Sequence, residues 1–420
     1  MTTPDSLTLQ RLARADAFAL PLDQIDVTKP RLFQTDTIGH YFERLRRDDP
    51  VHWQHNDFYG GFWSVTRYQD IMAVDTNHAV YSSDWAHGGI GLYDEPMDQR
   101  LQMFIAMDPP KHDAQRKAVS AIVAPGNLAA METTIRRRTA AVLDGLPRDQ
   151  PFNWVQRVSI ELTTQMLATL FDFPFDDRHK LTRWSDVATS IPSLDHIVES
   201  AEARSIELAE CLAYFTGLWN QRVNAPPQGD LISMLAHAPA TRHMSPQEFL
   251  GNLLLLIVGG NDTTRNSMTG GVLALHQHPE QLAKLRANAA LIDSAVPEII
   301  RWQTPLAHMR RTALADTELG GKQIKQGDKV VMWYLSGNRD ETAIERADEF
   351  IVDRARPRQH LSFGFGIHRC VGNRLAEMQL KILWEEILQR FPAIEVVGKP
   401  QRVFSAFVHG ITDLPVRIPG

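Results

Sequence analysis

The stretch FGFGIHRCVG (Phe363–Gly372) carries more information about this chain than any other ten residues. Its three glycines and two aromatic side chains indicate a tight loop that packs against a flat object. Cys370 stands at the end of the loop, directly before a predicted helix over 372–390. Backbone N–H groups at a helix start lower the pKa of a thiol, and a thiolate is a soft ligand suited to iron. A lone cysteine is more often a buried structural residue, but this context favours a ligand.

A second motif, GGNDTT (Gly259–Thr264), lies inside a predicted helix over 246–276. Two adjacent glycines weaken a helix by about 1 kcal/mol each, so we expect the helix to open at this point. Without Cβ atoms, the backbone also lets a flat ligand approach. Asp262 and Thr263 supply a carboxylate that can relay protons and a hydroxyl that can orient a water molecule. Taken alone, the motif is equally consistent with a kinked helix and its capping residues.

Two further pairs have the spacing of neighbours on one helix face. Glu298 and Arg301 are three positions apart, and His112 and Arg116 are four apart, shortly after a helix start at 108–110. By themselves such pairs are common on solvated helix faces and contribute little to stability. Such a pair indicates a function only where it binds a buried anion or stabilises a buried loop.

Helical periodicity dominates the rest of the chain. We predict helices over 38–47, 246–276, 279–285, 290–302 and 372–390. Strand patterns are fewer: a hairpin formed by 51–54 and 61–66, and short strands within 315–327 and at 329–334. The pattern predicts a mainly α fold with small, discontinuous β-sheets. We expect one large domain over residues 35–420, preceded by an N-terminal extension at residues 1–34.

Composition narrows the class of protein. The formal net charge of −6 argues against a general nucleic-acid binder. The only cysteines are Cys211 and Cys370, a count typical of a reducing compartment, although a single bridge between them stays open. The N-terminus lacks the apolar core of a signal peptide, and the run Leu253–Val258 is far too short to cross a bilayer. The sequence therefore predicts a cytoplasmic protein without a membrane anchor.

The cysteine loop matches, at every fixed position, the signature Phe-Gly-x-Gly-x-x-x-Cys-x-Gly of the cytochromes P450. The chain resembles a soluble bacterial member of that family from about residue 35 to its end. The resemblance implies the cytochrome P450 fold, a triangular helix-rich prism around a buried haem b (iron protoporphyrin IX). It also implies that Cys370 is the iron ligand, through which a thiolate favours O–O cleavage, and that Phe363 and His368 contact the haem.

The resemblance assigns roles to the other motifs as well. Asp262 and Thr263 become the acid–alcohol pair of the helix that crosses the haem face. Glu298 and Arg301 become a buried brace behind the haem, completed by Arg354, although Val352 stands where many members have proline. The expected contacts of the haem propionates are His112, Arg116, Arg311 and His368, with Arg310 as the neighbouring alternative to Arg311.

The amino-acid sequences of three segments, 104–112, 259–266 and 360–370, are similar to those of the bacterial alkane hydroxylases. This similarity implies terminal hydroxylation of medium-chain alkanes or fatty acids, with dioxygen and a hydrophobic small molecule as substrates. Because nothing on the chain resembles a flavin or iron–sulfur module, electrons are expected from a ferredoxin and its NAD(P)H-dependent reductase. Hydroxylases of sterol or branched-lipid side chains share part of these sequences, so hydroxylation of such side chains is the alternative function. A haem-binding sensor or carrier would need the cysteine loop but not Asp262 and Thr263.

The substrate pocket can only be assigned by position along the chain. A Gly-rich loop within 82–104 is where the family places its substrate-access loop, and the other candidates flank the distal helix, the brace helix and a C-terminal turn. The candidate side chains are Ile90, Leu92, Leu255, Val258, Gly259, Leu306, Met309 and Phe407. Each is equally consistent with plain core packing. Their apolar character predicts a narrow channel that presents only the end of a linear chain.

Overall fold

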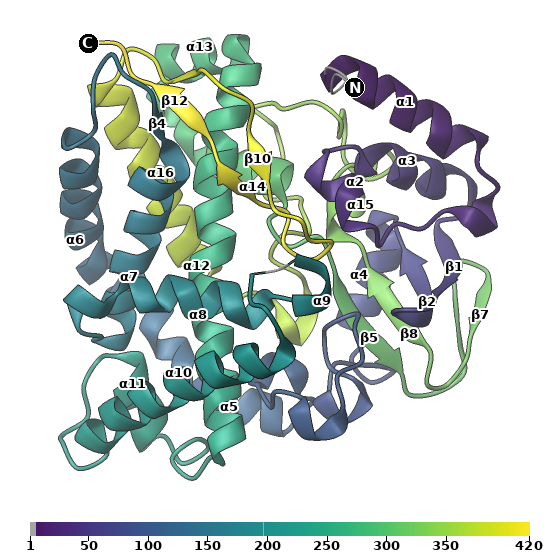
Figure 1. The fold of residues 1–420 in the computed structure, drawn as a ribbon, viewed down its shortest axis with the longest axis horizontal. Coiled ribbons are helices and arrows are strands. Elements are labelled where there is room, and N and C mark those ends of the chain that lie inside the picture. The colour runs from purple at the N-terminus through teal and green to yellow at the C-terminus, as the bar shows by residue number, and fades with distance from the viewer. Residues whose placement is uncertain (1–5, 196) are drawn as a thin grey trace.

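Helix α12 (Pro246–Gln277) is the longest helix of the described residues and runs through the centre of the molecule (Figure 1). A computed structural model describes residues 6–195 and 197–420. The helix begins where Ser245 caps it, accepting a hydrogen bond from the Glu248 N–H, with Pro246 at the first turn. It contacts α7, α8, α14 and α16, so apolar side chains are buried around most of its circumference.

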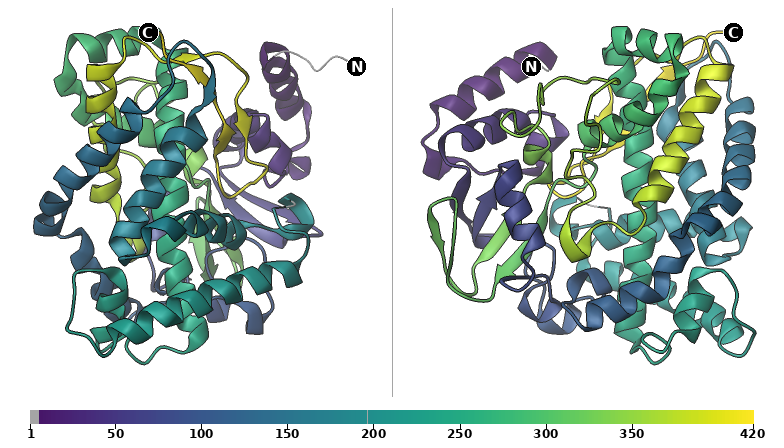
Figure 2. Two further views of the ribbon diagram at one scale, coloured as in Figure 1. Left: turned by 60° about the vertical axis from the view of Figure 1, so that its left-hand side comes forward. Right: turned by 180° about the vertical axis from the view of Figure 1, so that it is seen from behind.

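Some of the remaining helices pack around α12, and others lie beside the sheet region. They are α1 (Ser6–Ala19), α2 (Pro30–Gln34), α3 (Ile38–Asp48), α4 (Tyr68–Thr76), α5 (Lys111–Ser120), α6 (Pro125–Asp144), α7 (Glu161–Phe171), α8 (His179–Thr189), α9 (Pro192–Asp195), α10 (Ala201–Arg222), α11 (Leu231–His237), α13 (Pro279–Ala287), α14 (Ile292–Gln303), α15 (Tyr334–Gly337) and α16 (Asn373–Arg390). Seen from behind, α16 lies alongside α12 and α6 (Figure 2).

The β-structure is divided among four small sheets. The largest has five strands in the order β1-β2-β8-β5-β3, and only the β2–β8 pair is parallel. The others are β4-β12-β9, β6-β7 and β10-β11. The strands are β1 (Val51–Asn56), β2 (Gly60–Val65), β3 (Tyr81–Ser82), β4 (Phe152–Asn153), β5 (Met309–Ala313), β6 (Thr317–Leu319), β7 (Lys322–Ile324), β8 (Lys329–Met332), β9 (Glu395–Val396), β10 (Gln401–Arg402), β11 (Ile411–Asp413) and β12 (Pro415–Arg417). The predicted class, mainly α with discontinuous sheets, is confirmed.

The predicted opening of the central helix is wrong. α12 is continuous from Pro246 to Gln277, across both Gly259 and Gly260. Packing on several helices offsets the low helix propensity of the two glycines. Gly260 instead allows close approach of α7, because a Cβ there would lie 2.7 Å from Leu167 Cδ2.

The segment before residue 35 packs onto the sheet side of the fold. Helix α1 contacts α3, and Ala17, Ile25, Val27 and Phe33 are buried in the same apolar cluster as Trp333. The division at residue 35 stays a prediction. Of the helices in the described part of the chain, none combines the length and apolar character needed to cross a bilayer.

Candidate functional site

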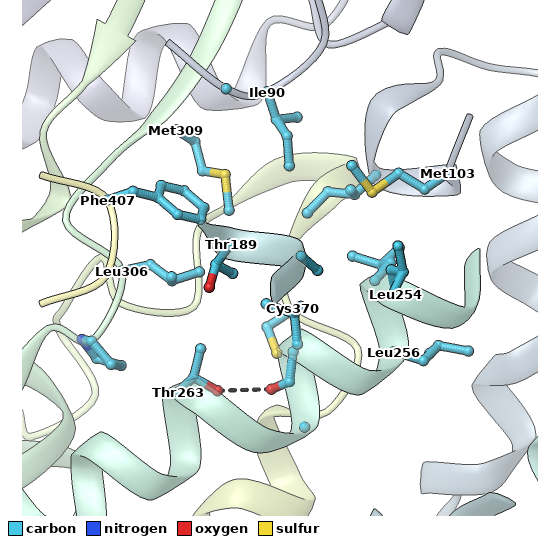
Figure 3. Close-up of a pocket in the computed structure, with 18 of the residues that line it drawn as sticks. Ile90, Met103, Thr189, Leu254, Leu256, Thr263, Leu306, Met309, Cys370 and Phe407 are labelled. Carbon is cyan, nitrogen blue, oxygen red and sulfur yellow. Dashed lines mark hydrogen bonds between the residues drawn. The ribbon is translucent and has the colours of Figure 1, made fainter. Parts of the chain in front are cut away.

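A cavity of about 450 Å³ lies between α12, the sheet region and the loop that carries Cys370. Its wall includes Gly259 and Thr263 from α12, Met309 from β5, and Phe363 and Cys370 from the cysteine loop. Figure 3 shows Thr263 and Cys370 at the same end of the cavity, with apolar side chains pointing into the space beyond them.

The backbone of the cysteine loop requires glycine at two positions. Gly364 and Gly366 have φ angles of +63° and +64°, in the left-handed region that side chains disfavour. A Cβ on Gly366 would also lie 2.5 Å from the carbonyl oxygen of Asp75. The Asp75 carboxylate accepts a hydrogen bond from the Phe365 N–H at 2.8 Å, and the Cys370 N–H donates to Phe363 O at 2.8 Å. The loop is therefore held mainly through its main chain.

The Cys370 thiol lies deep in the protein but is open to the cavity. Burial raises its pKa, and the N–H of Gly372 and the charges of Arg116 and Arg369 act in the opposite direction. A positive metal centre facing the sulfur would lower this pKa and stabilise the thiolate.

Cationic and imidazole side chains gather at one edge of the cavity. Arg116, Arg311 and His368 line the wall. His112 is not in the wall but stacks edge-on against His368, with ring centroids 4.4 Å apart. His112 Nε2 and His368 Nδ1 are buried and have no hydrogen-bond partner among the described residues. Burial lowers the pKa of His368 to about 2, with Arg311 adding to the effect, so its ring is neutral at neutral pH.

The side chains of Arg310 and Arg311 point in different directions. Arg311 lines the cavity and donates to Asp75 Oδ1 at 2.8 Å. Arg310 is turned the other way, where it pairs with Asp94 and donates to the carbonyl oxygen of His87. Adjacent residues of strand β5 point to opposite faces, so of these two arginines only Arg311 lines the cavity.

Glu298, Arg301 and Arg354 form one buried cluster beneath the cysteine loop. Arg301 makes two parallel hydrogen bonds to the Glu298 carboxylate, both at 2.7 Å, and Arg354 Nε donates to the same carboxylate at 2.9 Å. Glu298 and Arg301 are 0% exposed. Burial alone would raise the pKa of Glu298, but the two guanidinium groups bring it below the ordinary value.

The cluster reaches the cysteine loop through Asn338. Arg301 donates to the Asn338 carbonyl oxygen at 2.7 Å. The Asn338 side chain accepts from the Leu361 N–H at 2.6 Å and donates to Ser362 Oγ at 2.9 Å. Sequence analysis did not identify Asn338, because no local pattern signals a contact across 23 positions.

Asp262 and Thr263 lie on different faces of α12. Thr263 lines the cavity, and its hydroxyl donates to Gly259 O at 2.8 Å (Figure 3). Asp262 is 1% exposed and accepts from Ser185 Oγ at 2.9 Å and from Arg265. Arg265 also pairs with Asp186 at 3.1 Å, and Asp186 is partly exposed. A chain of charged groups thus leads from the outer surface to Asp262.

All eight predicted substrate residues lie in the cavity wall: Ile90, Leu92, Leu255, Val258, Gly259, Leu306, Met309 and Phe407. The prediction missed Met103, Thr189, Leu254 and Leu256, which also line the cavity (Figure 3). Leu254 could have been found, since it lies one helical turn before Val258. Thr189 is the last residue of α8, and no pattern in the sequence links it to α12.

Comparison with known proteins decides the family. A cytochrome P450 family model matches residues 220–407. Linalool 8-monooxygenase of Pseudomonas putida is 36% identical over 406 residues, which span 94% of this chain and 99% of that protein. The chain belongs to the cytochrome P450 family. It is therefore an oxidoreductase, a haem-thiolate monooxygenase that incorporates an atom of dioxygen into its substrate.

Two solved cytochrome P450 structures resemble almost all of the chain. Cytochrome P450-153 from Novosphingobium aromaticivorans is 48% identical with a TM-score of 0.87, covering 94% of this chain and 99% of that chain. CYP153D17 from Sphingomonas sp. PAMC 26605 is 50% identical with a TM-score of 0.89, covering 95% of this chain and 100% of that chain. The predicted cytochrome P450 fold is confirmed.

The residues present fit the haem that the family uses. Cys370 opens into the cavity, and Gly259 has no atom within 4 Å of a built Cβ, so a flat group meets no obstruction there. The orphaned imidazole nitrogens of His112 and His368, with Arg116 and Arg311, would receive the two propionates. When bound through a thiolate, haem supplies the activation of dioxygen and the cleavage of its O–O bond.

We predict that Glu298→Gln destabilises the protein by about 3–5 kcal/mol, because it leaves two buried arginines without a countercharge. The midpoint of thermal unfolding and the haem content per chain should both fall. The matched control is Glu395→Gln, which breaks the exposed pair with Arg417 and should change stability by about 1 kcal/mol or less. Since the folded pKa of Glu298 is depressed, its contribution is present at neutral pH and is lost as pH falls below about 4. Equal midpoints for wild type and Glu298→Gln at neutral pH would contradict the buried brace.

Proposed function

We propose that this cytochrome P450 hydroxylates the terminal methyl group of medium-length linear chains, alkanes or fatty acids. In this proposal Cys370 is the axial ligand of haem iron, and electrons come from a ferredoxin and its NAD(P)H-dependent reductase. The observation that supports the substrate class is the wall of the cavity beyond Cys370. Most of the side chains that converge there from the access loop, α12, the loop before β5 and the C-terminal turn are apolar (Figure 3).

Terminal selectivity needs such a wall for a chemical reason. A terminal C–H bond is stronger than the neighbouring secondary ones, so an unconstrained reaction would favour internal carbons. The walls formed by Leu306, Met309 and Phe407 on one side and Leu254 on another restrict the chain to an end-on approach. The similarity of the sequence to bacterial alkane hydroxylases supports the same assignment.

Thr263 and Asp262 are proposed to manage protons for the reaction. The Thr263 hydroxyl is fixed by Gly259 O and borders the cavity, where it can hold a water molecule beside the oxygen substrate. Asp262 lies one residue earlier on the same helix, in contact with Arg265, which reaches the partly exposed Asp186. The carboxylate is thus placed to exchange protons with solvent on the side away from the cavity.

Thr263→Ala should keep haem and NADH oxidation but divert electrons from hydroxylated product to hydrogen peroxide. Thr263→Ser retains a hydroxyl and is the matched control, with coupling close to that of wild type. Asp262→Asn should slow turnover by about a hundredfold, the lower end of what a positioned proton donor contributes, while coupling is largely kept. The ratio of product to NADH consumed measures coupling, and the rate of product formation measures turnover. Unchanged coupling in Thr263→Ala would remove Thr263 from the mechanism.

A series of linear alkanes tests the substrate class. Each added methylene should lower Kd by about fourfold, since burial contributes about 0.8 kcal/mol per CH₂, until the cavity is full. Primary alcohols should dominate the product. Phe407→Ala widens the wall and should increase the share of internal alcohols, whereas Phe175→Ala removes an exposed ring outside the cavity and should leave the product distribution unchanged. Predominantly internal alcohols from wild type would contradict the proposal, and turnover of sterols alone would favour the sterol or branched-lipid alternative.

A further inference from the structure

The cavity carries a second group of charged residues, distinct from the residues near His368. Glu95 and Arg100 enter the wall from the access loop, and Arg204 enters it from the first turn of α10. The side chains of Arg204 and Glu95 are 20% and 33% exposed, so they lie where the cavity approaches the outer surface. Sequence analysis found no fixed charge among the candidate substrate residues and did not identify this group.

Hydrogen bonds fix the Arg204 guanidinium, but one of its terminal nitrogens has no hydrogen-bond partner among the described residues. Its Nε donates to Val187 O at 3.2 Å, and one terminal nitrogen donates to Ala188 O at 2.9 Å. These carbonyl groups belong to the last turn of α8, which positions the guanidinium at the wall. The other terminal nitrogen is 3.6 Å from Glu95 Oε1, beyond hydrogen-bond distance. One edge of the guanidinium is therefore available to a better acceptor.

Glu95 is a poor partner for this arginine. Among the described residues, its carboxylate accepts no hydrogen bond, and the 3.6 Å ion pair with Arg204 is its only close charged contact. Burial raises the pKa of Glu95, and the charges of Arg204 and Arg100 only partly oppose the effect. Arg100 donates hydrogen bonds to carbonyl groups of the loop, including Glu95 O at 2.8 Å, and not to the Glu95 carboxylate.

The nearby Asp195 does not supply the missing acceptor. Its two oxygens accept hydrogen bonds from the N–H groups of Ile191 and Ile197, at 2.6 and 3.0 Å. Two guanidinium groups, Arg100 and Arg204, therefore face one weakly held carboxylate, that of Glu95.

We propose that Arg204 binds the carboxylate head of a chain acid whose methyl end lies toward Cys370, and that this carboxylate replaces Glu95 as its partner. The inference rests on the proposed function, because it assigns a head-group site to the same cavity. The available edge of Arg204 can form charge-assisted hydrogen bonds of normal length with an incoming carboxylate. Arg100 adds a favourable charge, and Glu95 can turn toward solvent because no hydrogen bond retains it.

The test compares dodecanoate with its methyl ester, which has the same chain but no charge. Kd for each is measured from the shift of the Soret band of the haem-loaded protein. The quantity compared between variants is the ratio of Kd for the acid to Kd for the ester. Arg204→Gln should raise the ratio at least tenfold, and Glu95→Gln should lower it, because a competing carboxylate is removed. The control is Arg183→Gln on α8, which breaks an exposed pair with Glu207 outside the cavity and should leave the ratio unchanged.

An unchanged ratio in either Arg204→Gln or Glu95→Gln overturns the head-group site, as does an equal rise in Arg183→Gln. Because the two variants act in opposite directions, a general loss of structure cannot produce the expected pattern. The products from linear alkanes separate this inference from the proposed function. If wild type gives terminal alcohols while the ratio does not respond to Arg204→Gln, only the head-group site fails.

Discussion

The loop that carries Cys370 has few anchoring side chains of its own and must be held through its main chain. Two buried carboxylates provide this support. Asp75 accepts from the Phe365 N–H and from Arg311, so one residue fixes both the loop and a cation at the edge of the cavity. Glu298 acts through Arg301 and Asn338 on the residues that lead into the loop. The position of the sulfur, and with it the geometry of the whole site, depends on these two anchors.

The charges of the cavity wall are separated from its apolar part. One group, Arg116, Arg311 and His368, includes an imidazole nitrogen without a hydrogen-bond partner among the described residues and suits the propionates of haem. The second group contains Arg204, Arg100 and Glu95. Between them the wall is formed by aliphatic, methionine and phenylalanine side chains (Figure 3). A linear chain gains affinity from this middle part by burial, and in the proposed head-group site Arg204 adds orientation and affinity for a carboxylate.

Local patterns in the sequence predicted much of this arrangement. The cysteine loop, the long central helix and the spacing of Glu298 and Arg301 are all encoded within a few residues. Arg354 required the family resemblance, since 53 positions separate it from Arg301. Asp75 was not predictable, because it meets Phe365 across 290 positions. The expected break in α12 was wrong, because propensity describes an isolated helix, and the packing of α7, α8, α14 and α16 keeps this one intact.

The ligand of the haem iron is tested most directly by the spectrum of the reduced protein with carbon monoxide. Wild type should show the strongly red-shifted Soret band of thiolate-ligated haem. Cys370→His should move the band to the position of an imidazole-ligated haem. Cys211→Ser is the matched control, because Cys211 is fully buried among Phe171, Phe215 and their neighbours, away from the cavity, and its loss should leave the band in place. An imidazole-type band in wild type, or a thiolate-type band that persists in Cys370→His, would contradict the assignment of Cys370.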